Sequence, residues 1–249
     1  MKTVMITGCS SGFGLETARY FLKQGWSVVA TMRNPDTAVL PASDRLRLLR
    51  LDVTDQDSIA RAVEAAGPID ALVNNAGIGW LSPFEGTSDQ VIRKIFETNV
   101  HGTFEMIRAV LPQMRSKTAG VIVNVSSSVT LKSLPLLPVY TASKAAVNAY
   151  TECLALELAP LGISVRLVLP GQAPATQFGS NAMALMAGES EAPEDYRPFV
   201  EDVMSAFKEN AAKEPTRPED VVKAVWRAVT DANCPLRLPA GSDAEALAA

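Results

Sequence analysis

A single-domain α/β fold, with a parallel sheet covered by helices on both faces, is the class that the sequence predicts. Short apolar runs alternate with longer amphipathic stretches from residue 3 to about residue 170. Most of the runs are largely apolar, as in strands buried on both faces, and the stretches between them have the length of crossover helices. No linker composition interrupts this alternation, so one domain accounts for the 249 residues.

The expected strands are the short apolar runs, and they form a doubly wound, mainly parallel sheet of seven strands. They cover residues 4–6, 27–30, 46–51, 71–73, 121–123, 165–168 and 236–238. Helical periodicity covers residues 14–24, 55–66, 89–114, 142–158 and 219–229.

Residues 171–217 break this rhythm. Four prolines and three glycines are scattered among Met, Phe and acidic residues, and helical character returns only from Pro198 to Ala212. The segment follows a strand at the edge where open α/β sheets bind ligands. We therefore expect residues 172–212, the flap, to be partly helical and to cover a substrate site. The alternative is an ordinary surface excursion.

Composition argues against several classes of function. The net charge is −4, and no block of like charge is long enough to follow a phosphate backbone, so nucleic acid is not an expected partner. One histidine (His101) and three scattered cysteines argue against a metal cage and for reduced thiols. The apolar segment near the N-terminus is too short for a signal peptide or a membrane span. We therefore expect a cytoplasmic protein with no metal and no membrane partner.

A glycine-rich loop follows the first expected strand and opens the first helix. It reads Thr7-Gly8-Cys9-Ser10-Ser11-Gly12-Phe13-Gly14. Glycines let a diphosphate approach the amides at a helix N-terminus, where unpaired N–H groups and the helix dipole favour an anion. The spacing is Gly-x3-Gly-x-Gly, not the common Gly-x-Gly-x2-Gly of dinucleotide sites. In its strand–helix context the loop predicts such a site, with candidate contacts at Gly8, Ser10, Ser11, Gly12, Phe13 and Gly14.

The end of the second strand bears on which dinucleotide binds. An acidic residue there would accept hydrogen bonds from the adenosine ribose and select NAD. The sequence has Met32 and Arg33 instead. A guanidinium matches a 2′-phosphate in charge and geometry, so Arg33 favours NADP(H). The alternative is a solvated arginine at a strand end.

A tyrosine and a lysine four residues apart are the candidate catalytic pair. Tyr140 and Lys144 share one face of the expected helix. A nearby ammonium favours the phenolate and would lower the pKa of the tyrosine toward working pH. Ser126, Ser127 and Ser128 end a buried strand beside the ligand crevice, where a hydroxyl could polarise the same carbonyl. The alternatives are a surface helix pair and a serine-rich turn or cap.

In this order along the chain, the motifs resemble those of the short-chain dehydrogenase/reductase family, in its single-domain form. The resemblance spans nearly the whole chain. It rests on the glycine loop, Leu51-Asp52-Val53, Asn74-Asn75-Ala76-Gly77, Asn99, the serine run, Tyr140 with Lys144, and Pro170-Gly171. It implies a Rossmann fold and hydride transfer between a nicotinamide cofactor and a carbonyl or alcohol carbon.

The resemblance also implies roles for individual residues. Tyr140 matches the family's proton donor or acceptor, and Lys144 the residue that lowers its pKa and holds the nicotinamide ribose. The family's serine lies thirteen positions before the tyrosine, which selects Ser127. Asn99 matches the asparagine that supports the lysine through a water. The other implied cofactor contacts are Asp52, Val53, Asn75, Ala76, Gly77, Pro170, Gly171 and Thr176; the threonine stands one position later than in the family.

The expected function is an NADP(H)-dependent oxidoreductase, by preference a ketone or aldehyde reductase, acting on a small molecule. Two alternatives stay open: an NAD-dependent alcohol dehydrogenase, and a sensor that binds NADP(H) without turnover. The resemblance further implies a homodimer or homotetramer formed through residues 88–116 and 140–159. The moderately apolar flap favours a hydrophobic substrate, and Trp80 is the aromatic residue expected to face it.

Overall fold

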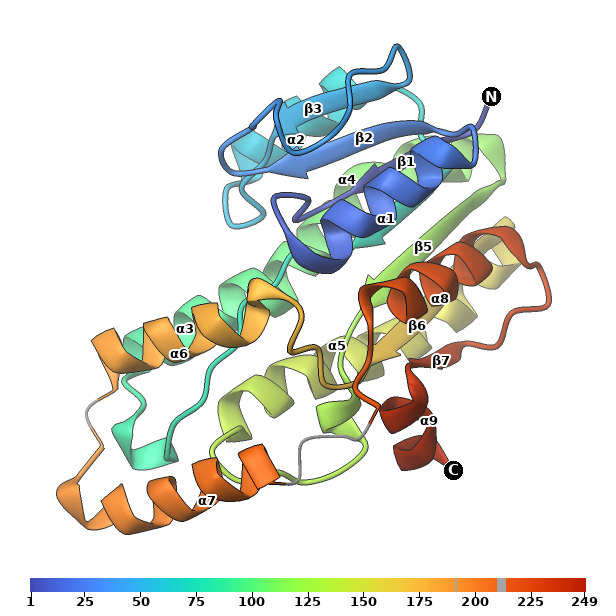
Figure 1. Ribbon diagram of the computed structural model, residues 1–249. Helices are drawn as coiled ribbons and strands as arrows, with labels where there is room; N and C mark the ends of the chain where they lie inside the picture. The colour runs from blue at the N-terminus through green and yellow to red at the C-terminus, as the bar shows by residue number, and fades with distance from the viewer. Residues whose placement is uncertain (191, 210–213) are drawn as a thin grey trace.

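The computed structural model of the protein describes residues 1–190, 192–209 and 214–249. At its centre lies a parallel sheet of seven strands in the order β3-β2-β1-β4-β5-β6-β7 (Figure 1). This confirms the predicted fold class. The strands are β1 (Thr3–Ile6), β2 (Ser27–Met32), β3 (Leu46–Arg50), β4 (Ala71–Asn74), β5 (Gly120–Val125), β6 (Ile163–Pro170) and β7 (Arg237–Ala240).

Helices cover both faces of the sheet (Figure 1). α1 (Gly12–Lys23) and α8 (Pro218–Thr230) pack on one face, where Phe21 and Val225 join the apolar core. α2 (Gln56–Ala66), α4 (Gly102–Lys117) and α5 (Pro138–Leu158) pack on the other, where Ile59, Met106 and Leu154 join a second core. A short last helix, α9 (Ser242–Ala248), follows β7.

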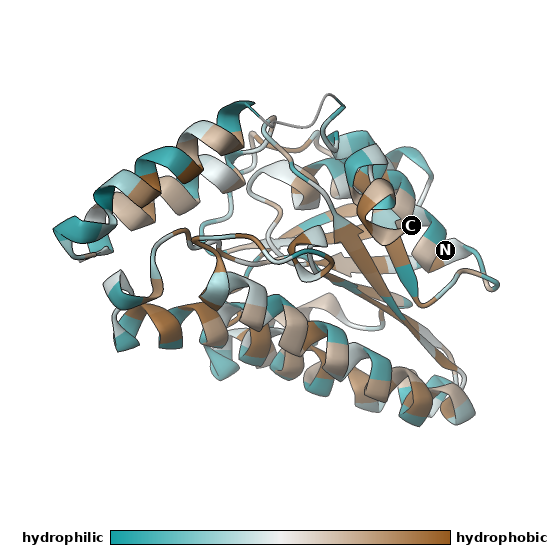
Figure 2. Ribbon diagram, turned by 90° about the horizontal axis from the view of Figure 1, so that it is seen from below, coloured by the Kyte–Doolittle hydropathy of each residue, from teal (hydrophilic) through white to brown (hydrophobic). Residues whose placement is uncertain are grey.

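The two cores explain why the inner strands β1, β2, β4 and β5 are largely apolar. Successive strand residues point to opposite faces, so in β1 Val4 and Ile6 belong to the core under α1 and α8, whereas Met5 belongs to the other. In β4, Leu72 and Val73 divide in the same way. Figure 2 shows the result, with strands that are largely brown between helices that carry both brown and teal.

One predicted helix contains a local widening. The sequence indicated a continuous helix over residues 89–114, whereas the structure has α3 (Asp89–Phe96), a π-helical turn (Glu97–His101) and then α4. A π turn holds one more residue than an α turn, and such turns are frequent at functional sites. One extra residue in a turn is too small a change to be seen in the periodicity of the apolar residues. Asn99 lies within this turn.

The flap contains two helices, of which only the second was predicted. α6 (Gln177–Glu189) lies beside α3 in Figure 1, and an ion pair of 2.9 Å joins Lys94 of α3 to Glu189. α7 (Arg197–Glu209) corresponds to the predicted helix over 198–212, whose residues 210–212 lie outside the described part. α6 buries only one residue, Ala182, so its sequence needs no apolar face. The periodicity that predicts a helix is therefore missing.

No helix in the described ranges is long and apolar enough to cross a membrane. All three cysteines are free thiols, with Cys9 and Cys234 buried and Cys153 exposed.

Strand β5, which lies between β4 and β6, should contribute strongly to stability. Ile122 is fully buried in the core beneath α4 and α5, so Ile122→Ala leaves a cavity and should lower the free energy of unfolding by about 2–5 kcal/mol in urea titrations. The control is Leu247→Ala, which truncates a side chain of α9 that is 41% exposed and should change it by about 0.5 kcal/mol or less. Equal effects of the two substitutions would contradict this assignment of the core.

Candidate active site

The predicted site residues meet at the edge of the sheet where the strands end. β1 pairs with β2 on one side and β4 on the other, so the strand order reverses between β1 and β4. Ligands of open α/β sheets bind in the crevice at such a reversal, outside the carboxyl ends of the strands. The glycine loop follows β1, residues 75–77 follow β4, and the serine run follows β5.

The glycine loop forms a tight turn into α1. Gly8 and Gly12 have φ of +74° and +58°, a region that favours glycine. A Cβ at Gly14 would lie 2.3 Å from the carbonyl oxygen of Gly8, so only glycine fits there. Asn75 fastens the loop to the end of β4, because its side-chain amide donates to the carbonyl oxygens of Thr7 (3.0 Å) and Gly8 (3.2 Å).

The remaining loop residues are placed differently. Ser10 is exposed, and the hydroxyl of Ser11 makes no capping bond to α1. The side chain of Phe13 packs against the core under α1, which leaves its backbone for a ligand. Ala76 lies against Gly8, since a Cβ there would come within 2.9 Å of the Ala76 Cα. The loop therefore presents backbone amides and serine hydroxyls at the start of α1, which suits a diphosphate.

The residues expected at the adenosine end are also brought together. Arg33 is exposed directly after β2, and Asp52 is half-buried after β3. Burial by itself would raise the pKa of Asp52, but hydrogen bonds from Thr54 and the charges of Arg33 and Arg50 together lower it. Val53 packs against the start of α4 at Gly102.

Tyr140 lies in the first turn of α5, 6% exposed. Burial raises the pKa of its phenol to about 12, and a hydrogen bond with the side chain of Ser127 acts in the opposite direction. Ser126 instead donates to Asn148 Oδ1 at 2.6 Å and belongs to the packing of α5 against β5. Of the serine run, Ser127 is thus the residue whose hydroxyl meets the phenol.

Lys144 lies one turn further along α5, 5% exposed. Its Nζ donates to the carbonyl oxygen of Val125 at 3.0 Å and lies 5.9 Å from the centroid of the Tyr140 ring. Burial lowers the pKa of Lys144 to about 8. From the spacing of the two residues, we expected this ammonium to lower the pKa of Tyr140. That expectation is wrong for this structure, because burial of the phenol outweighs every group that favours the phenolate.

Asn99 is held tightly by the backbone that follows β4. Its amide donates to the carbonyl of Ile78 (3.0 Å) and to Ser143 Oγ (3.1 Å), while its Oδ1 accepts from the N–H of Ile78 (2.9 Å). Gly77 lies between Asn99 and Lys144. A Cβ at this glycine would lie 3.2 Å from Asn99 Oδ1 and 3.5 Å from Lys144 Nζ. The π turn thus brings Asn99 to the same place as the lysine.

The start of the flap reaches both halves of the site. Pro170 ends β6 and Gly171 follows it, and Thr176 caps α6. A Cβ at Gly12 would lie 3.6 Å from Thr176 Cβ, so this threonine lies against the glycine loop. The ring of Phe178 lies 5.7 Å from that of Tyr140, centroid to centroid.

Two features of this region were not predicted from the sequence. Gly79 provides the space for Phe178, because a Cβ at position 79 would come within 2.9 Å of the Phe178 ring. No local pattern indicates this contact, which depends on how the flap folds back. Trp80 was expected to face a substrate, and this is wrong: it is fully buried and donates from its indole N–H to Thr87 Oγ1 at 2.9 Å.

Comparisons with known proteins agree with this arrangement. The family described as short chain dehydrogenase matches residues 2–184. Retinol dehydrogenase 8 of Homo sapiens is 34% identical over 95% of this chain and 80% of its own length. A short-chain dehydrogenase structure from Streptomyces avermitilis is 34% identical, with a TM-score of 0.85 over 99% of this chain and 91% of that one. A serine dehydrogenase structure complexed with NADP+ is 28% identical, with a TM-score of 0.80 over 96% of this chain and 94% of that one. On its fold, motifs and relatives, the chain belongs to the short-chain dehydrogenase/reductase family.

Proposed function

We propose that this oxidoreductase transfers a hydride between NADP(H) and a carbonyl or alcohol, and that it works chiefly as a reductase of apolar ketones or aldehydes. The observation that carries the proposal is the meeting of Ser127, Tyr140, Lys144 and Asn99 beside the glycine loop. A sensor without turnover would have no need of the full set. The three free thiols favour the cytoplasm as its compartment.

The chain has residues suited to each part of the cofactor. The glycine loop suits the diphosphate, because Gly14 lets the loop turn closely into α1, where the backbone amides at the helix N-terminus favour an anion. Arg33 suits a 2′-phosphate, beside Asp52 and Val53 for the adenosine. The complex of the related serine dehydrogenase with NADP+ supports this choice. When bound, the nicotinamide supplies the hydride.

The protein's own part in the chemistry is to hold the carbonyl and to supply a proton. Ser127 and Tyr140 would hold the carbonyl oxygen between their hydroxyls, and the phenol would protonate it. With a pKa near 12, Tyr140 carries its proton at neutral pH, which suits a donor and therefore reduction. Lys144 and Asn99, on either side of Gly77, would orient the cofactor ribose and return a proton to the phenol.

The surroundings of Tyr140 favour an apolar substrate. Phe178 and Ala182 of the flap close over Gly79, and Leu185 and Met186 pack against the buried cluster around Trp80. We take the flap as the cover of the substrate site. A retinol dehydrogenase, whose name denotes a largely apolar alcohol, is among the relatives.

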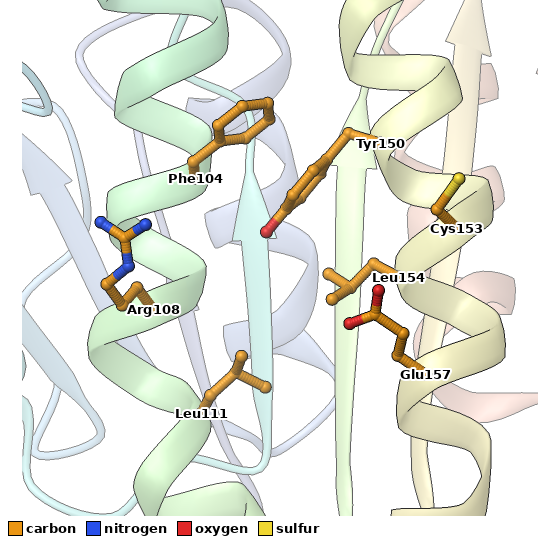
Figure 3. A pocket seen from close by; sticks show the side chains of 7 residues that line it. All are labelled: Phe104, Arg108, Leu111, Tyr150, Cys153, Leu154 and Glu157. Carbon is orange, nitrogen blue, oxygen red and sulfur yellow. The ribbon is translucent and has the colours of Figure 1, made fainter.

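A groove on the outer face of α4 and α5 supports the proposed homo-oligomer. Figure 3 shows Phe104, Arg108 and Leu111 on one helix, facing Tyr150, Cys153, Leu154 and Glu157 on the other. The groove has a volume of about 270 Å³, and the rings of Phe104 and Tyr150 stack at 3.9 Å. Tyr150 is about 15 Å along α5 from Tyr140, so this surface is separate from the catalytic residues. It suits the same pair of helices from a second copy.

Removal of the proposed proton donor decides between enzyme and sensor. Tyr140→Phe should lower kcat for NADPH-dependent reduction of a panel of aldehydes and ketones by about 10²–10⁴-fold, and should leave NADPH binding intact. Tyr150→Phe, on the same helix but outside the site, is the matched control. Loss of NADPH absorbance gives the rate, and quenching of protein fluorescence gives binding. Binding without turnover by the native protein, in either direction, would favour the sensor.

Arg33 tests the choice of cofactor. Arg33→Ala should weaken NADPH binding by about 10–100-fold, the value of one or two charge-assisted hydrogen bonds, and leave NADH binding unchanged. Arg61→Ala removes an equal charge from the exposed side of α2 and serves as the control. If NADPH affinity barely changes in Arg33→Ala, the NAD-dependent alcohol dehydrogenase becomes the better assignment.

The two shifted pKa values predict opposite pH profiles for the two directions. Lys144 is cationic below a pKa of about 8, and Tyr140 keeps its proton up to about 12. The kcat/KM for reduction should therefore be level near neutrality and fall above pH 8, by about tenfold per pH unit. Alcohol oxidation, which needs the phenol to accept a proton, should instead accelerate with rising pH.

Lys144→Arg provides the check on this assignment, because a guanidinium stays charged throughout the range. In this variant the fall in reduction above pH 8 should disappear, even where the rate itself is lower. A fall that persists unchanged in Lys144→Arg would show that another group titrates.

A further inference from the structure

A cluster of hydrogen bonds joins the two ends of the flap to the last helix. Asp243, in the first turn of α9, accepts from the N–H of Gln172 at 2.7 Å and from Thr216 Oγ1 at 2.6 Å. Thr216 Oγ1 in turn accepts from the N–H of Gly171 at 3.0 Å. The carbonyl oxygen of Ala240 is a second acceptor for the single proton of this hydroxyl, at 2.8 Å. Gly171 and Gln172 lie where the chain enters the flap, and Thr216 lies just after it. One carboxylate therefore holds both ends of this long excursion.

The chain makes room for these contacts with two glycines. A Cβ at Gly171 would lie 2.2 Å from Asp243 Oδ1, and a Cβ at Gly241 would lie 2.0 Å from Thr216 Oγ1. Gly241 also has a φ of +102°, which a side chain would make strained. Thr216 is 1% exposed, so its hydroxyl has exchanged water for these partners. Such close packing leaves little freedom in the relative positions of Asp243, Thr216 and the backbone at Gly171.

The acceptor in two of these bonds is the carboxylate of Asp243. Among the described residues, no lysine or arginine forms an ion pair with it, and its hydrogen-bond donors are an amide and a hydroxyl. Hydrogen bonds to a charged acceptor are stronger than those between neutral groups. The carboxylate is therefore suited to holding two chain segments that share no strand pairing with each other.

The position of the cluster connects it to the proposed cofactor site. Four residues after Gln172, Thr176 lies against Gly12 of the glycine loop, and Phe178 lies over Tyr140. The backbone held by Asp243 is thus the stretch that sets where Thr176 and Phe178 lie. Movement at Gln172 would carry over to both contacts, because Thr176 lies only four residues and Phe178 six residues further along the chain.

We propose that Asp243 and Thr216 form a clasp that holds the two ends of the flap together and thereby positions Thr176 against the glycine loop for cofactor binding. Both are positioning residues, which act through the flap and touch neither cofactor nor substrate. The cofactor part of this proposal rests on the proposed function.

The first test measures the flap without any ligand. Thr216→Val removes the hydroxyl at nearly constant volume, and Thr216→Ser keeps it. In the apo protein, amide hydrogen exchange over residues 171–178 should be about tenfold faster in Thr216→Val and close to native in Thr216→Ser. Exchange in β4 and β5 should not change. Asp243→Asn, which loses one acceptor, provides a second variant, and Glu245→Gln, an exposed carboxylate on the same helix, is the control.

The second test measures what the clasp does for the cofactor. In Thr216→Val and Asp243→Asn, KM for NADPH should rise by about fivefold to tenfold while kcat stays within about twofold, because binding and not the proton-transfer step is affected. Thr216→Ser and Glu245→Gln should keep the native KM. A general loss of structure would lower kcat as well and would not be rescued by serine.

Two results would overturn the proposal. Unchanged exchange over residues 171–178 in both Thr216→Val and Asp243→Asn would show that the cluster does not hold the flap. Faster exchange with an unchanged KM for NADPH would show that the flap's position does not matter for the cofactor. A native protein that binds neither NADPH nor NADH would refute the proposed function, and with it the cofactor part; the exchange measurement needs no cofactor and judges the clasp by itself.

Discussion

The parallel pairing of β1 with both of its neighbours is the constraint on which the rest of the site depends. Because every strand runs in the same direction, every carboxyl end opens at one edge of the sheet. The loops after β1, β4, β5 and β6 therefore converge there, although the first begins at Thr7 and the last at Gly171. Asn75 makes the convergence specific, since its amide ties the loop after β4 to the loop after β1. A sheet with one antiparallel strand in the centre would scatter these groups.

Most of the fold could be predicted because its signals are local. Seven apolar runs mark the seven strands, and the glycines of the first loop mark the turn into α1 by residue type alone. Features that depend on tertiary contacts could not be predicted. α6 shows no amphipathic pattern, because only Ala182 is buried, and the π turn around Asn99 adds a single residue to an otherwise regular helix. Trp80 follows a motif at the crevice, but its indole is buried among Val91, Ile95 and Val139 and donates to Thr87.

The same limit applies to the electrostatics of the site. The spacing of Tyr140 and Lys144 puts them on one face of a helix, and from this a lowered tyrosine pKa follows if the charge interaction dominates. Burial is not visible in the spacing, and it moves both groups toward their neutral forms: the phenol toward retaining its proton, the ammonium toward losing it. As a result, Tyr140 is protonated at neutral pH, and Lys144 has a pKa close to neutrality. A phenol that keeps its proton is the form that the proposed reduction needs.

The flap illustrates how a segment with little core of its own can still be held in place. Each of the helices α6 and α7 has only one buried residue. Apolar burial therefore fixes the position of these helices only weakly. Instead the segment is fastened at separate points: Asp243 and Thr216 at its ends, Lys94 at the far end of α6, and Phe178 in the space that Gly79 leaves free. Polar contacts of this kind break and re-form at lower cost than a packed core. The proposed role of the flap, a cover that admits cofactor and substrate and then excludes water, requires that combination of defined ends and loosely packed helices.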